Sequence, residues 1–253
     1  MKRFCLIFLS CLIVFVAFCG PAYHEKTYNQ NAWFMYFGDH KFSKKFGIHL
    51  EAQLRRENWG KNPQQLLLRS GFNYHPSSSI FYTVGYCFVE TYPYGNFPVK
   101  AAYPEHRFWE QMQIKSSLKT VEWISRFRLE QRFSQLPVLS AGIYEPGDAV
   151  YTNRFRILNR FSQALSGKSI QDKSIYLSLY DEVMLNFGKN IAANFFDQNR
   201  LYLALGYKIP KWGRLELGYL EQTIFKPDGI KIENNRTLQL GLSSTLDFFK
   251  SKR

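Results

Sequence analysis

The feature that most constrains this chain is an alternation of apolar and polar residues with a period of two. It is clearest over Val121–Phe133, where Val, Trp, Phe and Leu side chains alternate with Glu and Arg side chains. Successive side chains of a β-strand point to opposite faces of a sheet, so this period is typical of strands. Segments of the same kind recur along the chain, which predicts an all-β protein.

Ten segments are long enough to cross a bilayer as tilted strands, for which about 9–11 residues suffice. They are residues 44–57, 64–75, 79–91, 105–118, 121–134, 151–165, 174–187, 198–209, 213–225 and 235–248. Long connections alternate with mostly shorter ones, as in outer-membrane barrels. This alternation predicts long loops outside the cell and both chain termini in the periplasm.

One further segment, Ala32–Gly38, also has the composition of a strand. It would bring the number of strands to eleven, whereas bacterial single-chain barrels have even numbers. We therefore expect either an additional partner strand, which gives twelve, or a segment that packs elsewhere, which leaves ten.

The N-terminus has the pattern of a secretory signal peptide. Lys2 and Arg3 precede an apolar stretch, Phe4–Phe18, that is too short to span a bilayer comfortably as a helix. Small residues at Gly20 and Ala22 predict cleavage after Ala22. Residues 1–22 are thus expected to be the signal peptide and residues 23–253 the barrel domain.

The cysteines agree with export. A lipid anchor on Cys19 is the alternative to cleavage after Ala22. With cleavage, Cys87 is the one cysteine left, and no intramolecular disulfide can form. A lone thiol is best buried in an oxidising compartment, and Cys87 shares its strand face with Thr83 and Gly85, which we expect to point inward.

Periodicity alone does not say which face of the barrel points inward. A soluble barrel hides its apolar face, whereas a membrane barrel turns it to lipid. Export, long strands and alternating loops favour the membrane, as do the 23 Phe and 16 Tyr residues. The last segment adds support, because Leu238, Leu240 and Leu242 alternate with polar residues and Phe248 ends it. We expect a monomeric, antiparallel, up-and-down transmembrane β-barrel of 10–12 strands in the outer membrane of a Gram-negative bacterium.

If the apolar face meets lipid, the lumen is heavily charged. Its expected charge network is Arg55, Arg69, Arg107, Arg126, Arg128, Glu130, Arg132, Arg154, Arg156, Glu182 and Arg200. Strand parity also assigns Glu51, Gln53, Gln111, Glu122, Arg160, Arg214, Glu216 and Arg236 to the lumen.

Two interpretations of this lumen remain open. Buried charges are costly unless they are paired, so the residues either form an Arg–Glu network that fills a narrow barrel or line a water-filled anion path. Barrels of about eight strands are filled by side chains, and those of 16–18 hold an open channel. A barrel of 10–12 strands therefore predicts a structural barrel or a passive small pore, not a general porin.

An enzyme that modifies lipids at the membrane rim is the main alternative. The best candidate is His106, which lies between Glu105 and Arg107. The chain has no G-x-S-x-G motif and no metal-ligand spacing, and the adjacent acids Asp181 and Glu182 point to opposite faces of a strand. We therefore assign no catalytic residue, metal or cofactor. A third alternative is a surface interaction module that uses loops 92–104 and 135–150.

The net charge of +13 bears on the expected partners. Nucleic acid is a poor partner for an exported protein. Lipopolysaccharide phosphates, outer-membrane lipids and anionic solutes suit a basic protein better. We also expect contact with the barrel assembly machinery during insertion into the membrane.

A series of short motifs occurs in a fixed order along the chain. They are Glu105-His106-Arg107, Arg128-Leu129-Glu130-Gln131-Arg132, Arg154-Phe155-Arg156, Asp181-Glu182, Phe196-Asp197-Gln198-Asn199-Arg200 and Gly218-Tyr219-Leu220. This series resembles a family of exported bacterial β-barrels, the domain of unknown function DUF2490, over nearly the whole mature chain. The resemblance implies an outer-membrane barrel and supplies no activity, substrate or catalytic residue.

Overall fold

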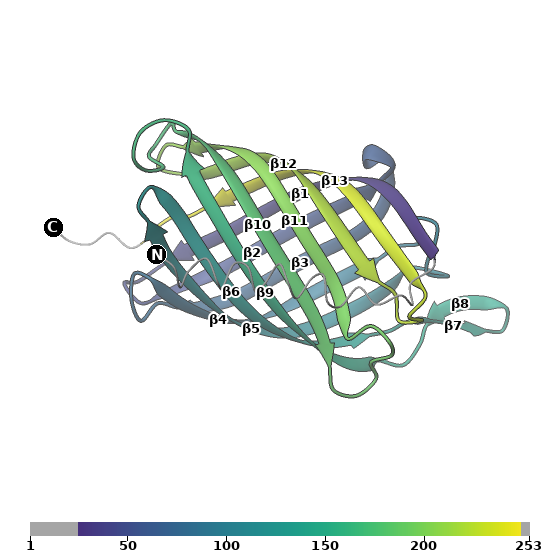
Figure 1. The fold of residues 1–253 in the computed structure, drawn as a ribbon. Coiled ribbons are helices and arrows are strands. Elements are labelled where there is room, and N and C mark those ends of the chain that lie inside the picture. The colour runs from purple at the N-terminus through teal and green to yellow at the C-terminus, as the bar shows by residue number, and fades with distance from the viewer. Residues whose placement is uncertain (1–24, 249–253) are drawn as a thin grey trace.

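The computed structural model describes residues 25–248, which build a closed barrel of eleven strands (Figure 1). The barrel strands are β1 (Glu25–Lys41), β2 (Phe46–Glu57), β3 (Asn62–Tyr74), β4 (Ile80–Thr91), β5 (Tyr103–Leu118), β6 (Val121–Ser134), β9 (Val150–Ala164), β10 (Ile175–Phe187), β11 (Phe196–Ile209), β12 (Gly213–Phe225) and β13 (Lys231–Ser244). A separate hairpin, β7 (Pro137–Ser140) and β8 (Ile143–Pro146), projects from one end of the barrel. A short 3-10 turn, η1 (Asn58–Gly60), connects β2 to β3.

Each of the ten predicted segments corresponds to a barrel strand, and the all-β barrel prediction is confirmed. The eleventh segment, Ala32–Gly38, lies within β1, which closes the barrel. On one side Trp33 pairs with Arg55 of β2 in antiparallel register; on the other it pairs with Gln239 of β13 in parallel register. The expectation of an even strand number is therefore wrong, because the first and last strands run in the same direction.

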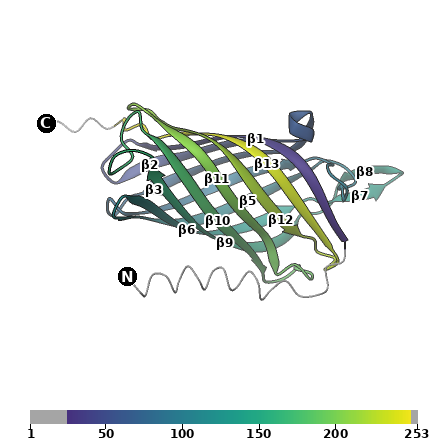
Figure 2. The ribbon, with the colours of Figure 1, turned by 45° about the horizontal axis from the view of Figure 1, so that its top comes forward.

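The odd number of strands separates the two ends of the described chain. β1 begins at the end that carries the long connections, such as 92–102 and 135–149, and β13 finishes at the opposite end (Figure 2). After β13 the chain pairs with the end of β1, where the Phe248 N–H donates to the Lys41 carbonyl at 2.8 Å. The expectation that both ends lie on the side of the short turns is thus wrong for the N-terminal end. The predicted signal peptide lies outside the described residues.

The barrel has an apolar exterior and a polar interior. Along β11, Leu201, Leu203 and Leu205 are each about half exposed, whereas Tyr202 and Ala204 between them are buried, as is Arg200 before them. The buried set as a whole is rich in Arg, Glu, Gln and Asn, and the exposed large residues are mostly Leu, Phe and Tyr. The apolar face of the strands therefore points outward, and the charged face points into the lumen, as expected for the membrane interpretation.

Aromatic side chains gather at both ends of this exterior. At the end of the short turns, Phe46 contacts Phe72 and Tyr74 with ring centroids 5.5 and 5.6 Å apart. At the opposite end, Phe133 and Tyr151 lie 5.1 Å apart. Within residues 25–248, no helix is long and apolar enough to cross a membrane.

A close approach of two strands on the inner wall explains one pair of glycines. Gly71 of β3 pairs with Gly85 of β4, and the indole of Trp109 lies over them. A Cβ atom on Gly85 would sit 2.7 Å from the Gly71 Cα and 2.9 Å from the Trp109 ring. Trp109 is 1% exposed and has no room to move, so this wall requires glycine.

We predict that Gly85→Ala lowers the free energy of unfolding by about 1–3 kcal/mol through overpacking. Gly241→Ala, also on the inner wall, should change it by less than about 0.5 kcal/mol, because the nearest atom to its Cβ is 3.8 Å away. Urea unfolding of the refolded proteins in detergent micelles measures both. Equal effects of the two substitutions would contradict the packing described for Gly85.

Candidate functional site: the charged lumen

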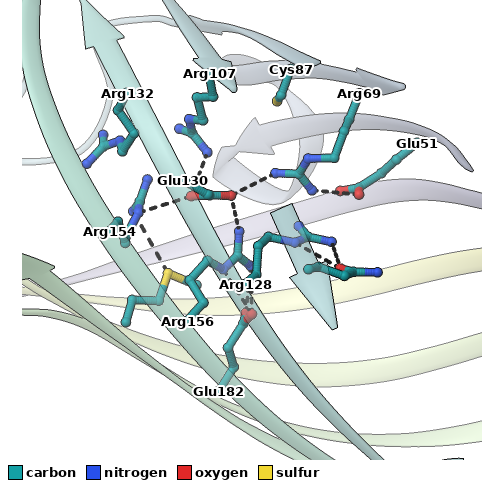
Figure 3. A network of polar contacts seen from close by, with 12 residues as sticks. Glu51, Arg69, Cys87, Arg107, Arg128, Glu130, Arg132, Arg154, Arg156 and Glu182 are labelled. Carbon is teal, nitrogen blue, oxygen red and sulfur yellow. Dashed lines mark hydrogen bonds and ion pairs between the residues drawn. The ribbon is translucent and has the colours of Figure 1, made fainter. Parts of the chain in front are cut away.

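The centre of the lumen is the carboxylate of Glu130 on β6, whose side chain is fully buried. Four guanidinium groups surround it, from Arg69, Arg107, Arg154 and Arg156, as Figure 3 shows. The N–O distances are 3.1, 3.6, 3.2 and 2.9 Å in that order. These arginines reach Glu130 because inward positions of β3, β5 and β9 lie at its level in the barrel.

A second carboxylate, Glu182 on β10, extends the cluster. Arg126 and Arg156 each donate to it at 2.7 Å, and Arg200 lies 3.7 Å away. Since Arg156 also contacts Glu130, the two carboxylates belong to one connected network. Such bonds to a charged partner are stronger than neutral hydrogen bonds.

Further carboxylates pair with arginines of the network. Glu51 pairs with Arg69 at 2.6 Å, Glu105 with Arg107 at 2.6 Å and with Arg132 at 2.5 Å, and Asp197 with Arg154 at 2.7 Å. Most buried charges in this part of the barrel therefore have a direct counter-charge, as burial requires.

Several of these ion pairs cross the lumen. Arg69 and Glu130 join β3 to β6, which are not neighbours in the barrel. Glu122 on β6 binds Arg214 on β12 at 2.8 Å, with three strands between them. The buried state of Glu130 shows that solvent does not reach the middle of the network. Paired charged side chains therefore fill the space around Glu130.

Two arginines of the network have no counter-charge. Arg128 donates to the Gln111 amide oxygen at 2.7 Å and lies over Trp109. Arg55 donates to Gln65 at 2.6 Å and lies over Trp33. Among the residues that the structure describes, no carboxylate oxygen lies within 4.0 Å of either guanidinium group.

The structure places all eleven members of the expected charge network in the lumen, nine of them in ion pairs. Arg236 is an exception among the other assigned residues. It lies on the exterior, with its guanidinium carbon 4.7 Å from the Tyr28 ring centroid. Its parity is that of Leu238 and Leu240, so the inward assignment of Arg236 was wrong. Cys87, by contrast, is fully buried on the inner face.

A basic vestibule lies between this network and the end of the long loops. It is a cavity of about 160 Å³. Its basic residues are Arg55, Arg69, Arg107, Arg132, Arg154, Arg156, Arg200 and Lys226, and Glu105 is the one carboxylate among the lining residues. We use the name basic vestibule for this cavity below.

The loop 92–102 covers the basic vestibule through Tyr94, Phe97 and Val99. The Tyr94 hydroxyl donates to Glu233, and the Gly95 N–H donates to Glu57 at 2.8 Å. Loss of hydration and the neighbouring Glu233 carboxylate raise the pKa of the Tyr94 phenol well above its usual value, so it stays a donor. Sequence reasoning missed this covering role, because no local signal pairs Tyr94 with a residue 139 positions away.

The candidate catalytic histidine does not lie in a site. His106 points to the exterior, where its Nδ1 is hydrogen-bonded to the Tyr86 hydroxyl. Its neighbours in sequence, Glu105 and Arg107, point into the lumen, so the three side chains do not meet. Over residues 25–248, no group of three His, Cys, Asp or Glu side chains is placed to hold a metal ion.

A family model described as protein of unknown function, DUF2490, matches residues 30–233. The match covers most of the chain and nearly every barrel strand, so the chain belongs to this family and the resemblance carried by the motifs is confirmed. Neither a curated protein nor a solved structure was found to match the chain.

We predict that Glu130→Gln lowers the free energy of unfolding by about 3–5 kcal/mol, because it removes the shared counter-charge of four buried arginines. Glu110→Gln is the matched control: Glu110 is exposed on the exterior and accepts a 3.1 Å hydrogen bond from Gln131. Loss of the Glu110 charge should change the free energy of unfolding by less than about 1 kcal/mol. Urea unfolding in detergent micelles tests both variants, and a Glu130→Gln protein as stable as the control would refute the central role of Glu130.

Proposed function

We propose that this protein is an exported outer-membrane β-barrel with a closed lumen, which serves as a structural barrel and not as an open pore. The observation that carries the proposal is the apolar exterior around a charged interior. In water, this arrangement would expose Leu and Phe and bury Arg and Glu, against the preference of both. In lipid, both faces are satisfied.

Strand length and aromatic placement support the membrane location. The barrel strands have between 12 residues, as in β2, and 17 residues, as in β1. About 9–11 residues are enough for a tilted strand to cross the hydrocarbon region. The aromatic clusters at the two ends of the barrel match the girdles of outer-membrane barrels at the lipid–water boundaries. The signal-peptide pattern of residues 1–22 agrees with export.

The closed lumen favours the structural role over passive solute flow. Eleven strands make a barrel between the filled eight-stranded and the open 16–18-stranded kinds. Here, ion pairs such as Arg69–Glu130 and Arg214–Glu122 occupy the space that a channel would need. Passage of a small anion along the arginines would require these pairs to separate.

The two alternatives have less support. The lipid-modifying enzyme loses its candidate residue, since His106 faces outward without a carboxylate partner. The hypothesis of a surface interaction module is weakened for one of its two loops, because residues 92–102 lie over the lumen. Its other loop keeps an exposed hairpin, in which Ile143 is 72% exposed. Outer-membrane lipids and lipopolysaccharide remain the proposed partners of the exterior, the barrel assembly machinery is proposed to insert the chain, and we propose a monomer.

We predict that single cysteines at Lys26 and Gly142 react with a membrane-impermeant maleimide from the same side of the membrane, and a cysteine at Lys211 from the other side. All three positions are exposed. Lys26 is the second residue of β1, and Gly142 lies in the β7–β8 turn at the same end of the barrel, whereas Lys211 lies in the β11–β12 turn at the opposite end. Cys87 is buried and gives a low background.

Labelling of intact cells, compared with lysed cells, measures this topology. Reaction of the Lys26 and Lys211 variants from the same side would contradict an eleven-stranded barrel that spans the membrane. Equal reaction of all three variants in intact cells would contradict the membrane location itself.

A further inference from the structure

Two arginines of the basic vestibule share one tryptophan ring. The guanidinium carbon of Arg55 lies 4.2 Å from the centroid of the Trp33 ring, and that of Arg200 lies 5.4 Å from it. Trp33 is 1% exposed and donates a 2.7 Å hydrogen bond from its Nε1 to Gln64. A fixed indole therefore holds both guanidinium groups. Of the five N–H groups of Arg55, three donate to Gln53 and Gln65, and the Nε of Arg200 has no hydrogen-bond partner among the described residues. Both side chains therefore keep donor capacity for a further acceptor.

These two arginines also have the weakest ion pairing among those that line the vestibule. Arg55 donates to glutamine amide oxygens and contacts no described carboxylate within 4.0 Å. The nearest carboxylate oxygen to Arg200 is that of Glu182, at 3.7 Å, and Glu182 already accepts from two other arginines at 2.7 Å. Both side chains are more than nine-tenths buried.

The charge of the whole vestibule is not balanced. Eight basic side chains line it. The described carboxylates within 4.0 Å of any of these side chains are Glu51, Glu105, Glu130, Glu182, Asp197 and Glu233. At least two positive charges are therefore left over in a largely buried space, where uncompensated charge is costly. A dianion would neutralise them.

The size of the vestibule limits what it can hold. A cavity of about 160 Å³ is close to the roughly 150 Å³ that accommodates a benzene-sized molecule. An inorganic phosphate or a small phosphate monoester fits this space. A whole lipid or a lipopolysaccharide sugar does not, and Phe97 and Val99 of the covering loop restrict the cavity further.

We propose that the basic vestibule is a binding site for a small phosphate oxyanion, and that Arg55 and Arg200 donate to it directly. Guanidinium groups match the oxygens of phosphate in pairs, which makes arginine better suited than lysine to such a site. Lys226, which also lines the cavity, adds a further positive charge. The inference depends on the geometry of the lumen and not on the membrane location, so its failure would leave the proposed outer-membrane barrel standing.

Calorimetric titration of the refolded protein in detergent with inorganic phosphate tests the site. We expect saturable binding by the unaltered protein, with the dissociation constant raised about tenfold or more in Arg55→Gln and in Arg200→Gln. Arg56→Gln is the matched control, because Arg56 follows Arg55 in β2 but points to the exterior and donates to the Gly60 carbonyl at 3.0 Å. It should bind phosphate as the unaltered protein does.

Two results would overturn the proposal. One is the absence of saturable phosphate binding up to about 10 mM phosphate. The other is equal phosphate affinity of the Arg55→Gln and Arg56→Gln proteins, provided that a heat-dependent shift in gel migration shows that both are folded. If Arg55→Gln does not fold, Arg55→Lys replaces it. This variant keeps the charge but loses the two-pronged contact, and it should still weaken phosphate binding measurably.

A competition experiment identifies the source of the phosphate group. Displacement by glycerol 3-phosphate, but not by a short-chain phosphatidate, assigns the site to free small anions, as the cavity volume predicts. Displacement by the phosphatidate alone assigns it to a lipid headgroup that enters from the rim. Either pattern supports an oxyanion site in the vestibule, and displacement by acetate as readily as by phosphate contradicts it.

Discussion

The burial of the Glu130 carboxylate among four guanidinium groups is the interaction on which the interior of this barrel depends. Each of these arginines loses its hydration in the lumen, and the loss is offset only where an anion is within reach. Glu130 stands where inward residues of β3, β5 and β9 converge on β6, so one carboxylate serves three other strands. The pair with Arg69 also joins β6 to β3, a strand that is not its neighbour in the barrel.

Closure of the barrel imposes a second constraint. The parallel pairing of β1 with β13 removes the two exposed edges that an open sheet would leave. It also places Trp33 against both β2 and β13, so the residue at the seam is the same one that supports Arg55 and Arg200. The seam and the basic vestibule are therefore parts of one structural unit, because Arg55 and Arg200 contact the indole of the same residue that pairs with both neighbouring strands.

Much of this fold was predictable from the sequence because its main signal is local. Alternation over Val121–Phe133 gave both the strand and the inward direction of Arg126, Arg128 and Glu130. The strand count and the position of the N-terminal end were not predictable in this way, because β1 and β13 are separated by some two hundred residues and no local pattern encodes parallel pairing. The outward direction of Arg236 could have been predicted, because Arg236 has the same strand parity as Leu238.

The ion pairs within the charged lumen were harder to predict from the sequence than the residues that line it. Strand parity collects the arginines and glutamates in the lumen, but which arginine remains without a carboxylate depends on the register across several strands. Arg55 and Arg69 are both inward arginines on adjacent strands, yet only Arg69 reaches Glu51 and Glu130. The covering loop shows the same limit, because the contact between Tyr94 and Glu233 exists only once the barrel has closed.

Single-channel recording in a planar bilayer tests the closed lumen most directly. The refolded protein should insert without steady conductance steps, because cross-lumen ion pairs fill its interior. Removing both members of one pair, with Glu130→Ala and Arg156→Ala together, leaves the net charge unchanged and should give steps with an anion-selective reversal potential. Steady, anion-selective steps from the unaltered protein would contradict the closed lumen and make the arginines the lining of an open path.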